Sequence, residues 1–226
     1  AEGVALPKQE WSFNGPFGSF DRAQLKRGWT VFKSVCSSCH SVHQLYYRNL
    51  VDIGFSEAEA KAIAAGDEVA TLDDNGEAAT RAALPSDKIK APFANDKAAR
   101  AANNGALPPD LSLMTKARKG GADYLYALMT GYSEPPAGYQ MQAGMSYNQY
   151  FPGHQIAMPA PLGEGVVTYE DGTNATVAQM AHDVATFLSW SAEPELEERK
   201  RMGIKVLAFL LVFTALLFAL KRKIWS

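Results

Sequence analysis

Cys36-Ser-Ser-Cys-His40 contains the only two cysteines in the 226 residues of this chain. Two thiols three positions apart can add across the two vinyl groups of one porphyrin, and the imidazole of the next residue can then reach the iron from the same side. The motif is the attachment signature of a c-type haem. It predicts one covalently attached haem c per chain, bound through Cys36 and Cys39 with His40 as an iron ligand, and it points to electron transfer.

Two other kinds of site also use a Cys-x-x-Cys pair. Zinc usually takes four protein ligands, and away from the motif and His43 the chain has no second cysteine pair and no closely spaced histidine pair. A redox dithiol usually follows a strand and opens a helix, whereas Cys36 comes late in an apolar helical pattern. Covalent haem is therefore the preferred reading, and a membrane-anchored thiol-disulfide protein is kept as an alternative.

The helical pattern before the motif is predicted to open at Asp21, with Gln24 as its capping-box partner. Apolar residues and both thiols then recur at helical spacing on one face, at Leu25, Trp29, Phe32, Cys36 and Cys39. The haem is therefore expected to cap the apolar side of this helix. Gly28 beside the stripe either permits the close approach of another helix or is incidental.

A second iron ligand is expected, because haem proteins that only pass electrons usually fill both axial positions, and Met opposite His raises the potential. Met141, Met145 and Met158 lie in the region 132–165, whose prolines and glycines predict a long functional loop. Met158 is favoured because Pro159 and Pro161 would restrain the chain around its thioether.

Histidine offers a rival to methionine as the distal ligand. His43 is too near His40 to cross to the other haem face, and His182 lies in a helical pattern. His154 is the serious competitor, because it stands four residues before Met158 in the same loop. Sequence spacing alone leaves Met158 and His154 open.

The C-terminal segment predicts one membrane-spanning helix. From Met202 to Leu220 the only charged residue is Lys205, and these nineteen residues would extend about 28 Å, which just covers a hydrocarbon core of about 30 Å. A helix is expected from about Thr176 to Ser191, with Pro194 breaking it, and a continuous anchor helix is expected from Glu195 to Ser226. We therefore expect an extramembrane domain over residues 1–194 and an anchor over residues 195–226.

Charge and processing signals bear on orientation. Residues 221–223 are Lys-Arg-Lys, which favours a cytoplasmic C-terminus, although residues 199–201 are also basic. Covalent haem attachment takes place outside the cytoplasm, so the N-terminal domain is expected in the periplasm or intermembrane space. The chain opens at Ala1 without a basic-then-apolar leader, and we expect the leader to have been removed.

Residues 52–77 form the most acidic region, with eight acidic side chains against the single base Lys61. A helix is expected from Ser56 to about Ala65, with Ser56 and Glu59 forming a capping box. The acidic side chains are either an ordinary solvated surface or a docking patch for a basic partner. Further helices are expected over 96–102, 110–118 and 123–129.

The chain resembles the cytochrome c1 family, the haem subunit of the ubiquinol:cytochrome c oxidoreductase, or bc1, complex. The resemblance covers nearly the whole chain. The segments that carry it are Lys26-Arg-Gly-Trp-Thr-Val-Phe-Lys-Ser-Val-Cys-Ser-Ser-Cys-His40, Ala102-Asn-Asn-Gly-Ala-Leu-Pro-Pro-Asp-Leu-Ser112, Ala117-Arg-Lys-Gly-Gly-Ala-Asp-Tyr124, Tyr150-Phe-Pro-Gly-His-Gln-Ile-Ala-Met-Pro159 and Ala192-Glu-Pro194 with its tail anchor.

The resemblance implies a mainly α, cytochrome c-like domain with long irregular loops and one C-terminal transmembrane helix. It implies that Met158 is the distal iron ligand. It also implies that Asn103, Pro109, Arg118 and Tyr124 line the haem, with Arg118 near a propionate, a role its guanidinium would suit. Some relatives carry a further cysteine pair that staples the region before the distal Met; this chain lacks it, so packing and prolines must hold the loop.

The function implied is one-electron transfer from the Rieske iron-sulfur protein to a soluble or anchored cytochrome c, beside cytochrome b and membrane lipid, within a dimeric complex. No substrate chemistry is expected on this chain alone, and no nucleic-acid signature is present. The location implied is the bacterial or mitochondrial inner membrane. A solitary membrane-tethered cytochrome c serving a terminal oxidase is a further alternative; the absence of a flexible linker after Pro194 disfavours it.

Overall fold

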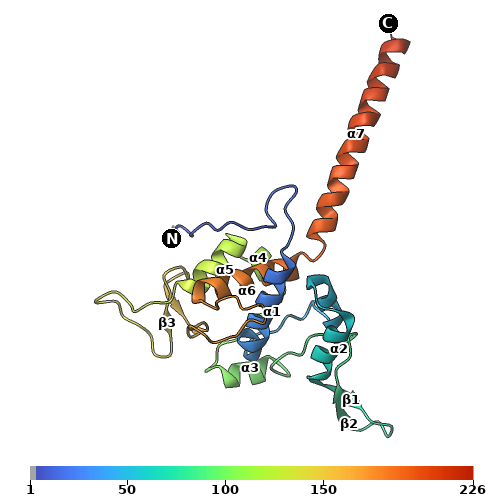
Figure 1. Cartoon of the computed structure of the whole chain (residues 1–226). Coiled ribbons are helices and arrows are strands. Elements are labelled where there is room, and N and C mark those ends of the chain that lie inside the picture. Colours follow the sequence, from blue (N-terminus) through green and yellow to red (C-terminus); the bar gives the residue numbers. More distant parts are fainter. Residues whose placement is uncertain (1–3, 226) are drawn as a thin grey trace.

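Helices dominate the structure, a computed structural model that describes residues 4–225. The α-helices are α1 (Arg22–Ser34), α2 (Glu57–Ala65), α3 (Asp96–Ala102), α4 (Met114–Ala117), α5 (Gly121–Thr130), α6 (Val177–Ala192) and α7 (Leu196–Ile224), with short 3-10 helices η1 (Cys36–Ser38) and η2 (Tyr47–Ile53). Two small antiparallel pairs complete the described part, β1 (Glu68–Leu72) with β2 (Ala78–Ala82) and β3 (Ser146–Tyr147) with β4 (Gln155–Ile156). The mainly α class is confirmed (Figure 1).

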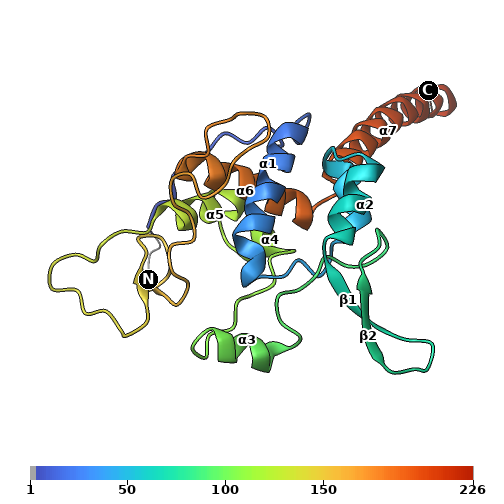
Figure 2. The same cartoon turned by 60° about the horizontal axis from the view of Figure 1, so that its bottom comes forward.

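The core forms where α1 crosses α6, near the middle of the domain (Figure 2). Trp29 and Phe32 of α1 pack against Phe187 of α6, with ring centroids 5.8 and 5.6 Å from it. Gly28 lies at the crossing, and a Cβ atom there would stand 2.2 Å from the carbonyl oxygen of Asp183. Gly28 is therefore required for the approach of the two helices and is not incidental.

Helix starts follow the predicted caps, although not every predicted side-chain bond forms. Asp21 accepts hydrogen bonds from the backbone of α1, and the Ser56–Glu59 capping box of α2 is complete. The side chain of Gln24 does not return to Asp21, because it is bonded to His182 across the helix crossing, 2.6 Å from Nδ1. The capping-box prediction for Gln24 was wrong for that reason.

Two other local predictions need correction. The helix expected over residues 110–118 is reduced to α4, because the preceding residues bond to the segment after His40: Leu111 N donates to Ser41 O, and Asp110 accepts from His43 N. The β1–β2 hairpin was not predicted. Its turn is closed by Asp73, which accepts hydrogen bonds from Asn75 N and Glu77 N.

Helix α7 leaves the domain as a single long rod (Figure 1). It has 29 residues, a mean hydropathy of 2.5 over its most apolar window, and no buried residue in that window. It is long and apolar enough to cross a membrane, as predicted for the anchor. The division into residues 1–194 and 195–226 stays a prediction, because the start of α7 is bonded to the domain: Glu197 accepts from Phe20 N at 2.7 Å and pairs with Arg22.

Candidate functional site

Cys36 and Cys39 lie directly after α1, where the helix tightens into η1. The backbone amides of Cys39 and His40 both donate to the carbonyl of Cys36, at 3.1 and 2.9 Å. Burial, with a smaller contribution from Cys39, raises the pKa of the Cys36 thiol to about 12. Such a thiol is a poor nucleophile in disulfide exchange, which needs a thiolate. The environment therefore argues against a redox-active dithiol at this pair.

His40 is oriented by the backbone of Pro109. Its Nδ1 lies 2.7 Å from the Pro109 carbonyl oxygen, and because a carbonyl can only accept, Nδ1 carries the proton. Burial lowers the pKa of His40, and the Pro109 carbonyl and Asp110 oppose that effect only in part. The imidazole is therefore neutral with Nε2 unprotonated, which is the form that binds a metal.

Met158 lies in the long loop, partly buried against the hydrophobic core. The hydroxyl of Tyr132 donates to the carbonyl oxygen of Met158 at 3.2 Å. Of the three loop methionines, Met145 is exposed, and Met141 is not among the side chains packed on the core in the described part of the chain. The structure thus distinguishes Met158 from Met141 and Met145.

Asn148 organises the loop that carries Met158, and sequence reasoning missed it. Its side chain is fully buried, donates to Leu128 O at 2.8 Å, and accepts from Tyr150 N and Phe151 N. Its backbone N donates to His154 O at 3.0 Å. A buried amide with its polar atoms satisfied fixes a loop firmly. No local pattern distinguishes Asn148 from the surface asparagines.

The rival histidines are engaged elsewhere. Both ring nitrogens of His182 have partners, Gln24 Nε2 at 2.6 Å and Glu10 O at 3.2 Å, and the ring stacks on Trp11. His154 stacks on Tyr147, with its Nδ1 3.4 Å from Asn148 O. His43 is exposed. These contacts leave Met158 as the stronger candidate for the second iron ligand.

Of the other residues that the resemblance assigns to the haem, Arg118 and Tyr124 are neighbours, and Asn103 lies apart from them. Tyr124 is buried; burial raises the pKa of its phenol, and the neighbouring Arg118 guanidinium offsets this in part. Tyr124 is also a neighbour of Tyr132, whose pKa burial raises above its usual value. The structure therefore brings Arg118 and Tyr124 toward the tyrosine that holds Met158. Asn103 ends α3, and its side-chain amide is bonded to Ala99 O at 2.7 Å.

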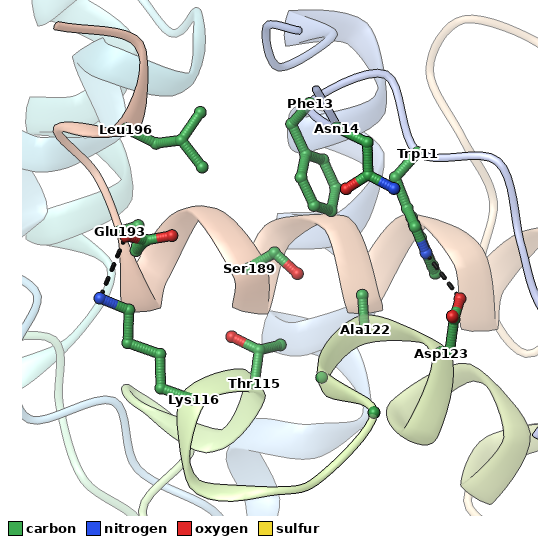
Figure 3. A pocket seen from close by; sticks show the side chains of 12 residues that line it. Trp11, Phe13, Asn14, Thr115, Lys116, Ala122, Asp123, Ser189, Glu193 and Leu196 are labelled. Carbon is green, nitrogen blue, oxygen red and sulfur yellow. Dashed lines mark hydrogen bonds and ion pairs between the residues drawn. The ribbon is translucent and has the colours of Figure 1, made fainter. Parts of the chain in front are cut away.

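A separate cavity of about 290 Å³ lies between the N-terminal arm, the start of α5 and the end of α6 (Figure 3). Trp11 Nε1 donates to Asp123 Oδ1 at 2.7 Å on one side, and Lys116 pairs with Glu193 at 3.1 Å on the other. None of the predicted haem-binding residues lines it. These contacts join Trp11, near the N-terminus, to α5, and they join α4 to the end of α6.

The donor set fits a covalently attached haem. Two neighbouring thiols precede a neutral imidazole whose Nε2 is unprotonated, and a methionine is held by a neighbouring hydroxyl. The family model described as "Cytochrome C1 family" matches residues 11–226. The chain belongs to this family.

Curated members of the cytochrome c1 family are similar over almost the whole chain. "Cytochrome c1" of Rhodospirillum rubrum is 52% identical over 240 residues, covering 99% of this chain and 88% of the relative. "Cytochrome c1 2, heme protein, mitochondrial" of Arabidopsis thaliana is 50% identical, covering 99% and 73%. "Cytochrome c1, heme protein, mitochondrial" of Saccharomyces cerevisiae is 47% identical, with the same coverage.

Membership in the cytochrome c1 family confirms two predictions from the sequence. The chain carries haem c, attached covalently at its Cys-x-x-Cys-His motif. It is the membrane-anchored haem subunit of an inner-membrane bc1 complex, with α7 as its candidate anchor. The solitary tethered carrier and the thiol-disulfide protein are not favoured.

Proposed function

We propose that this chain passes single electrons from the Rieske iron-sulfur protein to a soluble or anchored cytochrome c. The supporting observation is His40, whose Nδ1–H bond to Pro109 leaves Nε2 unprotonated directly after two free thiols. The bound haem iron supplies the one-electron chemistry. The protein fixes the iron ligands, shields them from water and exogenous ligands, and positions the site above the membrane.

Each proposed ligand has a defined role. Cys36 and Cys39 hold the porphyrin, while His40 binds iron through Nε2, with its basicity increased by the Pro109 carbonyl. Met158 would supply the second iron ligand, and its thioether would raise the potential. Tyr132 holds its backbone. Arg118 is proposed to neutralise a propionate beside Tyr124, and Asn103 to line the haem edge through its backbone or methylene, since its amide is bonded to Ala99.

Met158→Leu tests the ligand assignment. Replacing the thioether with a side chain that cannot bind iron is expected to lower the reduction potential of the full-length holoprotein, because the Met ligand favours reduced iron. Met145→Leu, an exposed methionine of the same loop, is the control and should leave the potential unchanged. An unaltered potential in Met158→Leu would exclude this residue as a ligand and direct attention to His154.

The acidic region is proposed as the docking surface for cytochrome c. Helix α2 and the β1–β2 hairpin project from the body of the domain (Figures 1 and 2). Six of the eight acidic residues of this region are exposed and have no ion-pair partner in the described structure, namely Asp52, Glu57, Glu68, Asp73, Asp74 and Glu77. Such a surface would steer a basic partner and lose its effect at high salt.

Charge reversal in the hairpin tests this docking proposal. The triple variant Asp73→Lys, Asp74→Lys, Glu77→Lys should slow electron transfer to a basic cytochrome c at low ionic strength and weaken its salt dependence. Reversal of Glu164, an acidic residue outside the region, is the control. Equal rates and salt slopes in both variants would contradict the docking role.

The assembly and the orientation are also proposals. We place cytochrome b and the Rieske protein beside α7 and the domain, in a dimeric complex. The domain is placed in the periplasm or intermembrane space, with residues 221–223 on the opposite side, since haem attachment occurs outside the cytoplasm and basic residues favour the cytoplasmic side. Protease protection of α7's C-terminal end in sealed right-side-out vesicles supports this orientation, and its cleavage there opposes it.

A further inference from the structure

Residues 11–20 form an uncharged loop directly before α1. Its sequence is Trp-Ser-Phe-Asn-Gly-Pro-Phe-Gly-Ser-Phe, with no acidic or basic side chain among the ten residues. We call residues 12–19 the N-terminal loop. Ser19 N donates to Ser12 O at 3.1 Å, so the loop is closed at its base.

The aromatic side chains in and beside the N-terminal loop differ in their exposure to solvent. Phe13 and Phe20 are buried and in contact, with ring centroids 4.9 Å apart. Phe17, between them in sequence, is 82% exposed. The closed base and the buried neighbours fix the loop, so Phe17 cannot be covered by a simple collapse of the chain. A single exposed Phe is ordinary on a protein surface, so the exposure of Phe17 gains meaning only from where this loop lies.

Hydrogen bonds hold this loop against the first turns of α7. Lys200 Nζ donates to Phe13 O at 2.6 Å and to Gly18 O at 3.1 Å. The apolar run of α7 begins at Met202, two residues beyond Lys200, or about 3 Å further along the helix axis. Figure 1 shows the N-terminal loop rising beside the base of α7, toward the side on which the helix leaves the domain.

We propose that the N-terminal loop is a second membrane contact, which places Phe17 at the boundary between phospholipid headgroups and acyl chains. The bilayer that α7 enters begins at the level of this loop, so no other element has to move. Lys200 is engaged by the loop and Arg199 by Glu193, and the exposed Arg201 beside them suits the level of the lipid phosphates. An uncharged loop with an aromatic tip suits this interface, whose polar and apolar layers accept both parts.

A nitroxide at position 17 tests the proposal. Cys36 and Cys39 are consumed by the haem, so the full-length holoprotein with Phe17→Cys carries one reactive thiol, and three labels per chain would instead report failed haem attachment. The holoprotein is measured in phosphatidylcholine vesicles with some anionic lipid. Compared with a label at a water-exposed position of the chain, the label at position 17 should collide far less often with a water-soluble nickel chelate and more often with oxygen. The expected depth is about 5–10 Å below the headgroup surface.

Two matched positions calibrate the measurement. Leu72 is 67% exposed and belongs to β1, a strand that Figure 1 shows at the far end of the domain from α7, so a label in Leu72→Cys should remain accessible to nickel. Leu211→Cys lies within the apolar run of α7 and should report the bilayer interior. An unchanged haem absorption spectrum confirms that each variant is folded.

Two results would overturn the proposal. One is nickel accessibility at position 17 equal to that at position 72. The other is a label that nickel reaches in vesicles of the chain alone but that neither nickel nor oxygen reaches in the purified bc1 complex, because a protein subunit would then cover Phe17. Shielding from nickel with access to oxygen in both preparations supports the lipid contact.

Discussion

Tyr132 ties the loop of the proposed distal ligand to the helical body. Its hydroxyl donates to the carbonyl of Met158, 26 residues further along the chain. Burial, and to a smaller extent Tyr124, raises the pKa of Tyr132 above its usual value, so the phenol remains a donor at all physiological pH values. The bond acts on the backbone at Met158 itself, where a displacement would move the thioether relative to the iron.

Tyr132→Phe is expected to loosen the distal ligand. The variant loses one partly buried hydrogen bond, with a cost of about 0.5–1.5 kcal/mol, and leaves the Met158 carbonyl without this donor. We expect a faster exchange of the distal ligand for added imidazole, measured by stopped-flow absorption of the oxidised holoprotein. Tyr139→Phe removes a bond to Gly153 in the same loop and is the control. Equal exchange rates would show that Tyr132 does not hold the ligand.

For single residues, the sequence predicts the role of functional residues that are adjacent in the chain. It does not predict contacts between residues that are distant in the chain. Cys36, Cys39 and His40 stand together, so the covalent chemistry of the motif limits their role directly. Tyr132 and Asn148 act on residues that only the folded chain brings near them. The assignments of Met158, Asn103, Pro109, Arg118 and Tyr124 as haem-binding residues remain predictions.

The crossing of α1 and α6 depends on the absence of a side chain at one position. Gly28 allows the backbone of α1 to approach the carbonyl of Asp183, while Arg27 pairs with the Asp183 carboxylate at 3.0 Å. Asp183 is fully buried and also accepts from Gln179 at 2.9 Å. The two helices are therefore joined by close backbone contact and by a partly buried ion pair.

Gly28→Ala is expected to destabilise the domain. The new methyl group would meet the Asp183 carbonyl and Phe187 Cβ, and overpacking of this kind costs about 1–3 kcal/mol. Denaturant titration of the holoprotein, followed by haem absorption, measures the loss. Gly203→Ala in α7 meets no atom within 4 Å and should not destabilise the domain. If Gly28→Ala were as stable as Gly203→Ala, α1 and α6 would be able to move apart at their crossing without loss of stability.

Asp67 ties the β1–β2 hairpin to the helices. Partial burial alone would raise the pKa of its carboxyl, but hydrogen bonds from Lys33 and Tyr47 outweigh burial and lower it. A lowered pKa in the folded state means that the stabilisation is complete above the ordinary Asp pKa of about 3.9 and is lost as the pH falls through the folded value.

Asp67→Asn should therefore reduce stability at neutral pH, on the order of 1 kcal/mol because Lys33 is partly exposed. The difference from the unmodified protein should shrink as the pH falls below about 4. Unfolding by urea at a series of pH values measures both effects, with Asp74→Asn at the exposed hairpin turn as the control. A difference that is constant with pH would refute the linkage.

At the scale of elements, caps and periodicity account for most of what the sequence predicts. The starts of α1, α2 and α6 follow from Asp21, Ser56 and Thr176, because caps act within one turn. The hairpin was missed although Asp74-Asn75-Gly76 is a turn sequence, since the acidic residues around it were considered only as charge. The close approach at Gly28 depends on a helix more than 140 residues away.

The anchor and the domain form one connected body in the described structure. Glu197 accepts two hydrogen bonds from Arg22, at 3.0 and 2.7 Å, and Lys200 bonds to the N-terminal loop. The Arg22 bond is the largest cause of the lowered pKa of Glu197. The first turns of α7 are therefore bonded to the domain and are part of its folded structure, although the sequence predicts them as part of the anchor.

Two truncated chains test this joint. A chain that ends at Pro194 lacks Glu197 and Lys200, whereas one that ends at Arg201 keeps both. The shorter chain should be less stable by about 1–3 kcal/mol, because several hydrogen bonds of about 0.5–1.5 kcal/mol each are lost and exposed ion pairs add little. Thermal unfolding of both holoproteins gives the comparison. Identical stabilities would place the boundary after residue 194, as the sequence predicts.

The bonds of Arg22 to Glu197 and of Lys200 to the N-terminal loop oppose rotation of the domain about α7. The two cysteines and the imidazole that would hold the haem are then kept at one orientation relative to the axis of α7. We therefore expect changes in the distance over which an electron must tunnel to come mainly from motion of the donor or the acceptor.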